Sequence, residues 1–339
     1  MPRFLRALSG ALALLLVLTG CAAAPSAQER QFTAMDTFMH LTAYGSGAAN
    51  GLDKAQEDIL FLDSLLDVTD KQSEVYALNH RSAPTLTLSP ELTALLEQAL
   101  LLAKQTEGAF DPTIYPLVQA WGFTTGSYQV PEAATLEELL PLVDYTAPVL
   151  AGNALILPEG VELDFGGIAK GWAGDRAIQQ LRGCGVTSAI LRLGGNIQTI
   201  GAKPDGTPWR VGIQDPAGEN TLAVVSVTDQ AVVTSGSYQR YFTADGQRYH
   251  HIIDPGTGRP TDNELASVTV IGDYGTQCDA LSTALFVMGT EQAARFLRAH
   301  GDFEAVFIHT DGRVVITSGL TDTFSLMDGY THVPVEVLE

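Results

Sequence analysis

A series of short strand-like runs in the second half of the chain restricts the fold more than any other feature. Each run alternates or is continuously apolar over five to eight residues and is bounded by Gly, Pro, Asn or Asp. Helical stretches separate some of the runs, so the pattern predicts an α+β fold, with two subdomains of mainly antiparallel sheet that share one cleft. The runs are "VELDF", "TSAILRLGG", "WRVGIQDP", "TLAVVSVTD", "QAVVTSGSYQRYF", "QRYHHIIDPGTGRP", "LASVTVIG" and "FEAVFIHTDGRVVIT".

The first half of the chain is mainly helical. Residues 34–50 predict a strand that enters a Gly-rich turn, and "GLDKAQEDILFLDSLLD" has apolar residues at helical spacing. A second helix begins after Ser89, with Pro90 in its first position, and Gly108 closes it. The following "AFDPTIYPLVQAWGF" is expected to be irregular and to expose Trp121 and Phe123, and residues 126–160 to be loop and short helix.

The N-terminus has the composition of an export signal. Two arginines precede the apolar "ALSGALALLLVL", which is too short for a stable membrane span, and "LTGC" ends at Cys21. That sequence resembles a bacterial lipobox, so we expect residues 1–20 to be a signal peptide, 21–31 a lipidated tether and 32–339 the catalytic domain. The chain would then be anchored by lipid at Cys21 to the extracytoplasmic face of the cell membrane. A plain signal peptide or an uncleaved anchor is the alternative.

The charge balance excludes several partners. Loss of residues 1–20 would remove two arginines and move the formal net charge from −20 to −22. Such a surface repels nucleic acid and anionic lipid headgroups, so neither is an expected partner. A phosphate-bearing ligand would need a local cation. The remaining cysteines, Cys184 and Cys278, are expected to be free and largely buried.

The apolar stretch "CDALSTALFVMG" carries an unexpected pair of polar groups. Asp279 and Thr283 are four residues apart, so their oxygens lie on one helix face and can converge on an ion such as Mg²⁺. Alternatively, Thr276 and Asp279 have the spacing of a capping box, in which Asp279 would only stabilise the start of the helix.

A second polar stretch is "LDFGGIAKGWAGD". Asp164 follows a strand-like run, Gly166 and Gly167 permit close backbone approach, and a helix is expected beyond them. Free N–H groups at such a junction suit an anion, and Lys170 is one of the few cations available. The alternative is a tight turn with a solvated lysine. The stretch does not match a P-loop, and the later "LGGNIQTIG" does not match the dinucleotide-binding glycine pattern.

A third candidate is "HHIIDPGTGRP". A histidine at a strand end beside a rigid Pro/Gly turn can act as a general base near pH 7, and His251 is our candidate. A structural role is the alternative, and the spacing does not distinguish His251 from its neighbour His250.

Taken in order, these stretches resemble the ApbE family of FAD:protein FMN transferases. The resemblance begins near Ala34 and covers essentially the rest of the chain. It lies in "MDT", "SEVYALN", "FDPTIYPLVQAWGF", "LDFGGIAKGWAGD", "LRLGGNI", "VVTSGSYQRYF", "HHIIDPGTGRP" and "CDALSTAL". Family members often carry an aromatic residue shortly before the second block, where this chain has Thr69.

The resemblance implies roles for individual residues. The FAD would be bound by Met35, Trp121, Gly122, Phe123, Asp164, Lys170 and Ile253. The Mg²⁺ would be bound by Asp279, Thr283, the region of Ser282 and the backbone carbonyl of Gly167.

The reaction that the resemblance implies is transfer of FMN from FAD to a threonine or serine hydroxyl of a target flavoprotein, with release of AMP. His251 would be the base, and Asp279 would assist as a metal ligand. The expected acceptors are flavoprotein subunits of membrane redox complexes. Two alternatives are an FAD pyrophosphatase, which would use the same residues with water, and a non-catalytic flavin-binding lipoprotein.

Overall fold

A large mixed sheet organises the molecule in the computed structural model, which describes residues 26–338. Its strand order is β1-β2-β6-β7-β10-β15-β16-β17-β19, and neighbours are antiparallel except β17 and β19. The α+β prediction is therefore confirmed. The strands are β1 Ala27–Ala34, β2 Thr37–Tyr44, β6 Ser188–Leu193, β7 Asn196–Ile200, β10 Ala231–Gly236, β15 Leu265–Gly272, β16 Glu304–His309, β17 Val314–Thr317 and β19 Val335–Leu338.

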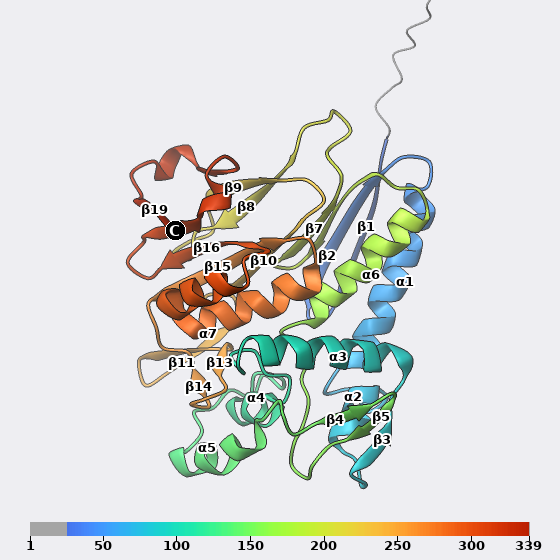
Figure 1. Cartoon of the computed structure of the whole chain (residues 1–339), viewed down its shortest axis with the longest axis vertical. Helices are drawn as coiled ribbons and strands as arrows, with labels where there is room; N and C mark the ends of the chain where they lie inside the picture. The colour runs from blue at the N-terminus through green and yellow to red at the C-terminus, as the bar shows by residue number, and fades with distance from the viewer. Residues whose placement is uncertain (1–25, 339) are drawn as a thin grey trace, which may run out of the picture.

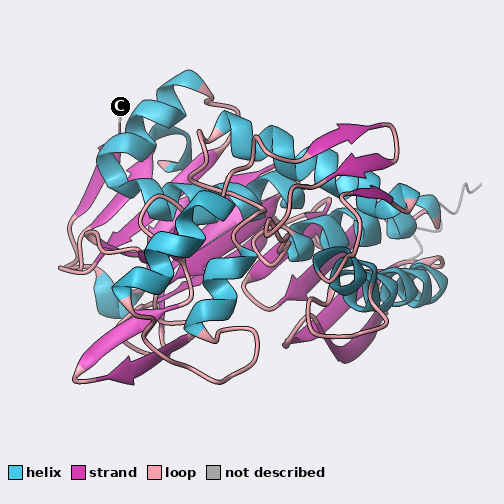
Figure 2. Cartoon of the chain, turned by 90° about the horizontal axis from the view of Figure 1, so that it is seen from below, coloured by secondary structure: helices cyan, strands magenta, loops and turns pink. Residues whose placement is uncertain are grey.

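The two faces of this sheet have different partners (Figures 1 and 2). Helices α1, α6 and α7 cover one face, and a small sheet of β18, β9 and β8 covers the other. Leu191 of β6 packs on the helical side, and its neighbour Ile190 packs on the other, as the two-residue period of a strand requires. These elements are α1 Ala48–Leu66, α6 Ala169–Gly183, α7 Gly275–Ala299, β8 Trp209–Gln214, β9 Thr221–Val227 and β18 Phe324–Leu326.

A lobe of shorter elements lies beside the sheet, at the bottom of Figure 1. Its longest helix begins as predicted, because the Ser89 hydroxyl accepts the Leu92 N–H and Pro90 is in the first turn. The lobe and its connections comprise α2 Glu74–Asn79, α3 Pro90–Gln105, α4 Tyr115–Trp121, α5 Ala133–Leu139, β3 Thr85–Thr87, β4 Val149–Ala151, β5 Ala154–Ile156, β11 Tyr241–Ala244, β12 Gln247–His250, β13 Ile253–Asp254 and β14 Arg259–Pro260; the 3-10 helices are η1 Leu140–Leu142, η2 Ser318–Leu320 and η3 Asp328–Tyr330.

The first hairpin was not expected from the sequence. β1 begins at Ala27, inside the expected tether of residues 21–31, and pairs with β2 along its whole length. The strand is an edge strand whose residues are mainly polar, so it lacks the apolar alternation that indicates a strand. Cys21 and residues 1–20 lie outside the described residues.

Other local predictions were wrong. Residues 109–123 were expected to be irregular, but Tyr115–Trp121 forms helix α4. "VELDF" forms no strand beyond a bridge between Glu162 and Ile114. Trp121 and Phe123 are buried rather than exposed, because the lobe closes around them into a core of its own with Leu117, Leu136 and Ile253.

The predictions about cysteines and membrane segments can be compared with the structure only for residues 26–338. Cys184 and Cys278 are both free; Cys278 is buried and Cys184 is half-buried. Within residues 26–338, every helix is too short or too polar to span a bilayer.

Candidate functional site

The start of α7 is held by another helix and not by a capping box. Tyr274 is the N-cap residue and makes no side-chain cap. Instead the Asp175 carboxylate, from α6, accepts the backbone N–H groups of Gly275 and Thr276 at 2.8 and 2.9 Å, and the Thr276 hydroxyl as well. The capping role considered for Asp279 is therefore wrong, and its carboxylate is available for another purpose.

Asp279 faces the beginning of α6. Its Oδ2 accepts the Gly171 N–H at 2.8 Å and lies 4.0 Å from Lys170 Nζ, and its side chain is almost completely buried. Burial raises the pKa of Asp279, although the Lys170 ammonium and the Gly171 N–H act in the opposite direction. A buried carboxylate beside one cation is suited to binding a further positive charge.

The hydroxyls near Asp279 come from two elements. Ser235 of β10 lies 2.8 Å from the Ser282 hydroxyl and 3.3 Å from the Thr283 hydroxyl. The Ser282 hydroxyl also donates to the backbone carbonyl of Asp279 at 2.9 Å, so both of its hydrogen bonds are to other groups of the protein. Thr283 lies beside the Gly-Gly turn: a Cβ added to Gly167 would be 3.7 Å from Thr283 Oγ1. The fold thus brings Gly167, Asp279 and Thr283 together.

The Gly-Gly turn is closed by its own polar groups. Asp164 accepts the Gly166 N–H, and Lys170 Nζ donates to the Gly166 carbonyl at 3.3 Å. Burial raises the pKa of Asp164, while the positive charges of Lys170 and Arg240 lower it. Lys170 therefore acts on both carboxylates of the site, and the alternative of a simply solvated lysine is wrong.

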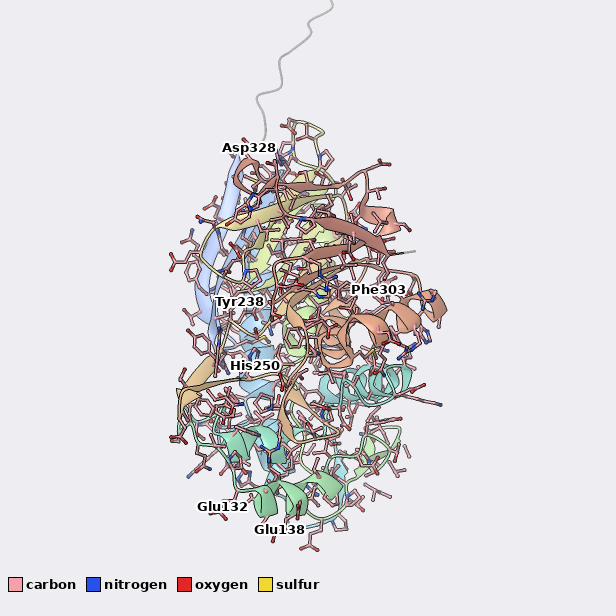
Figure 3. All side chains as sticks on the ribbon, turned by 90° about the vertical axis from the view of Figure 1, so that its left-hand side faces the viewer. Glu132, Glu138, Tyr238, His250, Phe303 and Asp328 are labelled. Atoms are coloured by element: carbon pink, nitrogen blue, oxygen red, sulfur yellow. The ribbon has the colours of Figure 1, made fainter. Side chains whose placement is uncertain are left out.

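The two histidines have different surroundings. His250 Nε2 contacts the Thr261 carbonyl at 2.9 Å, and its ring packs edge-on against Phe286, so His250 is structural. Figure 3 shows His250 at the level where the sheet meets the lobe that carries Glu132 and Glu138. His251 Nδ1 lies 3.2 Å from the Arg240 carbonyl. Since a carbonyl only accepts, Nδ1 carries the proton and Nε2 holds the lone pair.

Burial lowers the pKa of His251 to about 3, and the charges of Arg240, His250 and Lys170 act in the same direction. The imidazole is therefore neutral at physiological pH. The neutral imidazole of His251 is the form that can accept a proton. An anionic ligand nearby would raise the pKa of His251, because it would favour the charged imidazolium.

The predicted flavin contacts lie in two places. Met35 is in the β1–β2 turn, with φ +49°, and its N–H donates to Asp63 at 2.7 Å. The next residue, Asp36, lies 3.4 Å from Arg240. Trp121, with 0% of its surface exposed, donates to the Gly258 carbonyl at 2.8 Å.

The other predicted contacts adjoin Trp121. Gly122 ends α4 with φ +78°, where a Cβ would collide with the Ser127 carbonyl. Phe123 and Ile253 pack in the same core, and the Phe123 ring lies edge-on to His251 with centroids 6.4 Å apart. The aromatic side chains of this core therefore pack beside His251, and their contact with FAD stays a prediction.

Sequence reasoning missed several residues that build the site. Ser235 and Arg240 lie in the strand-like run "QAVVTSGSYQRYF", and nothing in their spacing indicates that they approach Thr283 and His251. Asp175, Asn196 and Gln198 were also missed, because their partners are on other elements. A cavity of about 340 Å³ between α3, α6 and α7 is lined partly by Asp175 and Thr276, and none of the predicted site residues lines it.

An antiparallel α+β scaffold whose glycine turn lies beside a buried carboxylate and two cations has the charge arrangement that suits a phosphate-bearing ligand. The comparisons give that class a family. The ApbE family model matches residues 35–307, and the chain belongs to the ApbE family.

Relatives and solved structures agree with this assignment. The chain is 36% identical over 316 residues to the FAD:protein FMN transferase of Treponema pallidum, which covers 86% of this chain and 87% of that protein. It is 35% identical to the protein of the same name from Klebsiella pneumoniae, over 79% of this chain and 85% of the relative. The crystal structure of the ApbE protein from Thermotoga maritima has a TM-score of 0.83 at 30% identity, and covers 88% of this chain and 99% of its own. The flavin transferase ApbE from Vibrio cholerae has a TM-score of 0.80 at 27% identity, with the same coverage.

Proposed function

We propose that this protein transfers FMN from FAD to a threonine or serine hydroxyl of a target flavoprotein, with release of AMP and with Mg²⁺ as cofactor. One observation carries the proposal: in a chain related to FAD:protein FMN transferases, Asp279, Thr283 and Gly167 meet beside Lys170. The convergence joins a helix and a turn more than 100 residues apart in sequence.

The donor groups suit Mg²⁺. A carboxylate, a hydroxyl and a backbone carbonyl are hard oxygen ligands. Within residues 26–338, no three His, Cys, Asp or Glu side chains are grouped for a metal, so a cation here would take further ligands from water and substrate phosphates. When bound, Mg²⁺ supplies positive charge that offsets the negative charge developing on the pyrophosphate. Asp279, Thr283 and the Gly167 carbonyl would hold it.

The protein's own groups account for the rest of the reaction. Lys170 and Arg240 attract the dianionic pyrophosphate into a chain of strongly negative charge. The acceptor hydroxyl oxygen forms a bond to the FMN-side phosphorus, and the bond from that phosphorus to the bridging oxygen breaks. AMP leaves with the bridging oxygen, and His251 Nε2 takes the hydroxyl proton.

The test is incubation of the protein with FAD, Mg²⁺ and an acceptor domain that carries a reactive threonine. Flavin fluorescence on the acceptor in a denaturing gel supports transfer, and its loss when that threonine is changed to valine identifies the linkage. Free FMN and AMP without labelled acceptor would show a pyrophosphatase, and unchanged FAD would show a flavin-binding protein; either result contradicts the proposal.

We further propose that Cys21 is lipidated and holds the enzyme on the extracytoplasmic face of the cell membrane, where flavoprotein subunits of membrane redox complexes are its acceptors. The lipobox-like "LTGC" supports this location. A Cys21→Ser variant should move from the membrane fraction to the soluble fraction and lose labelling by a palmitate analogue. Unchanged fractionation and labelling would contradict the proposal.

A further inference from the structure

Gln198, on β7, occupies a slot made by glycines of two helices. A Cβ added to Gly275 of α7 would lie 1.6 Å from Gln198 Nε2, and one added to Gly174 of α6 would lie 2.1 Å from it. No side chain fits at either glycine while the amide is in place. The two helices and the strand therefore meet around one buried amide.

Hydrogen bonds fix the orientation of that amide and of its neighbour. Gln198 Nε2 donates to the Gly171 carbonyl at 3.0 Å, and the same nitrogen lies 3.4 Å from Asn196 Oδ1. Because the Gly171 carbonyl only accepts, the nitrogen of Gln198 must face it, and the oxygen of Asn196 then faces Gln198. Asn196 is thereby obliged to turn its Nδ2 the other way.

The Nδ2 of Asn196 is a buried donor without a partner. Asn196 has 0% of its surface exposed, and Nδ2 makes no hydrogen bond to any of the described residues. Asp279 is close to this amide, because Gln198, which contacts Asn196, donates to the Gly171 carbonyl, and the N–H of the same Gly171 donates to Asp279. A buried donor left unsatisfied lowers the stability of the folded state, because it has lost its hydrogen bond to water and gained no other. The cost is offset if the carboxylate moves onto the amide when the site is loaded.

We propose that Asn196, oriented by Gln198, is a positioning residue that fixes the Asp279 carboxylate toward the metal. The Gly171 N–H already donates to Oδ2 of this carboxylate, and the unpartnered Asn196 amide of β7 would supply a second donor. Two donors from different elements would restrict the rotation of the carboxylate and its distance from Thr283. This inference rests on the proposed Mg²⁺ site.

The experiment measures metal–nucleotide coupling and not activity. The affinity for ADP is determined by calorimetry with Mg²⁺ and with EDTA, and the ratio of the two dissociation constants is the gain due to metal. Asn196→Leu keeps the volume and removes the donor, and should reduce this gain about 10-fold, as loss of a group behind a metal ligand commonly does. Thr199→Val is the matched control, because Thr199 is buried on the same strand and, among residues 26–338, its hydroxyl bonds only with the backbone of Gln230.

The outcomes separate this inference from the proposed metal site. No gain in the wild type, or a gain that Asp279→Ala retains, would overturn the metal site and this inference with it. If the Mg²⁺-dependent increase in ADP affinity is lost in Asp279→Ala but retained in Asn196→Leu, the metal site stands and only the positioning role of Asn196 is overturned. If Asn196→Leu does not fold, Gln198→Met takes its place. A decrease of the Mg²⁺-dependent increase in ADP affinity by less than 10-fold then supports the proposal, and no decrease contradicts it.

Discussion

Lys170 sets the electrostatics of the site at the scale of single residues. Its ammonium is 4.0 Å from Asp279 and lowers the pKa of both Asp279 and Asp164, whose burial acts in the opposite direction. Lys170 is shared by the buried Asp279 and the half-buried Asp164, and Arg240 acts on Asp164 alone, so negative charge stays in excess at Asp279. A divalent ion compensates that excess, and Lys170 keeps the pair from repelling a phosphate when no ion is bound.

The role of Asp279 is tested by Asp279→Ala. We expect transfer to fall below detection, because the buried carboxylate is the only charged ligand in the proposed set, while the far-ultraviolet circular dichroism stays that of the wild type. Lys170→Met is a useful companion and should weaken FAD binding more than turnover at saturating FAD. Full activity of Asp279→Ala at saturating Mg²⁺ would contradict the ligand role.

His251 gives a prediction about pH. Since the pKa of His251 is lowered to about 3, the free enzyme holds this imidazole neutral from pH 5 to 8. A plot of kcat/KM against pH, which reports the free enzyme, should therefore show no inflection near 6.5 from this group. His251→Ala should lower kcat more than it lowers FAD affinity. An equal loss in both parameters would make His251 a binding residue and not a base.

At the scale of elements, the site depends on how α6 meets α7. Asp175 of α6 caps the first N–H groups of α7, and Gly171 lies so close that an added Cβ would be 2.2 Å from the Gly275 carbonyl. Lys170 and Asp279 are on these two helices. This clamp holds together the two helices that carry the cation and the carboxylate, and Asp279 adds to it by accepting the Gly171 N–H.

Asp175→Ala tests the clamp. The substitution leaves two backbone N–H groups without their acceptor, so the free energy of unfolding should fall by about 1–2 kcal/mol, as it does on loss of a helix cap. The apparent affinity for Mg²⁺ in the transfer assay should fall as well. Urea unfolding and a Mg²⁺ titration measure the two effects. Glu291→Ala, an exposed residue of α7 that pairs with Arg295, is the control and should change neither.

At the scale of the whole molecule, the large sheet places parts of the site that are distant in sequence. β7 and β10 are adjacent near its middle, so Asn196 and Ser235 reach the same end of α7. The lobe of α4 and α5 adds Trp121 and Phe123 from another side, with His251 between lobe and sheet. The cations Lys170 and Arg240 face this junction in a chain that is otherwise strongly acidic.

Stability should depend on pH because of the same junction. The pKa of His251 is about 3 in the folded protein and about 6.5 in an unfolded chain, so between these values the unfolded state binds more protons. The stabilising contribution is fully present above pH 6.5 and is lost as the pH falls toward 3. Urea unfolding at pH 7, 5.5 and 4.5 should show a shallower loss of stability for His251→Gln than for the wild type. Parallel curves would contradict this.

The sequence by itself determined what depends on neighbours along the chain. Ser89 and Pro90 begin a helix, and Asp279 and Thr283 share a helix face, because hydrogen-bond partners a few residues apart are fixed by local geometry. The ordered motifs also indicated the family, which the comparisons confirmed.

Only the tertiary structure decided which groups meet across elements. It distinguished His251 from His250, replaced the expected cap of α7 by Asp175, buried Trp121, and linked Asn196 to Asp279 through Gln198 and Gly171. These contacts between elements join residues from 11 to more than 130 positions apart. Their energies come from packing and desolvation, which no local spacing encodes.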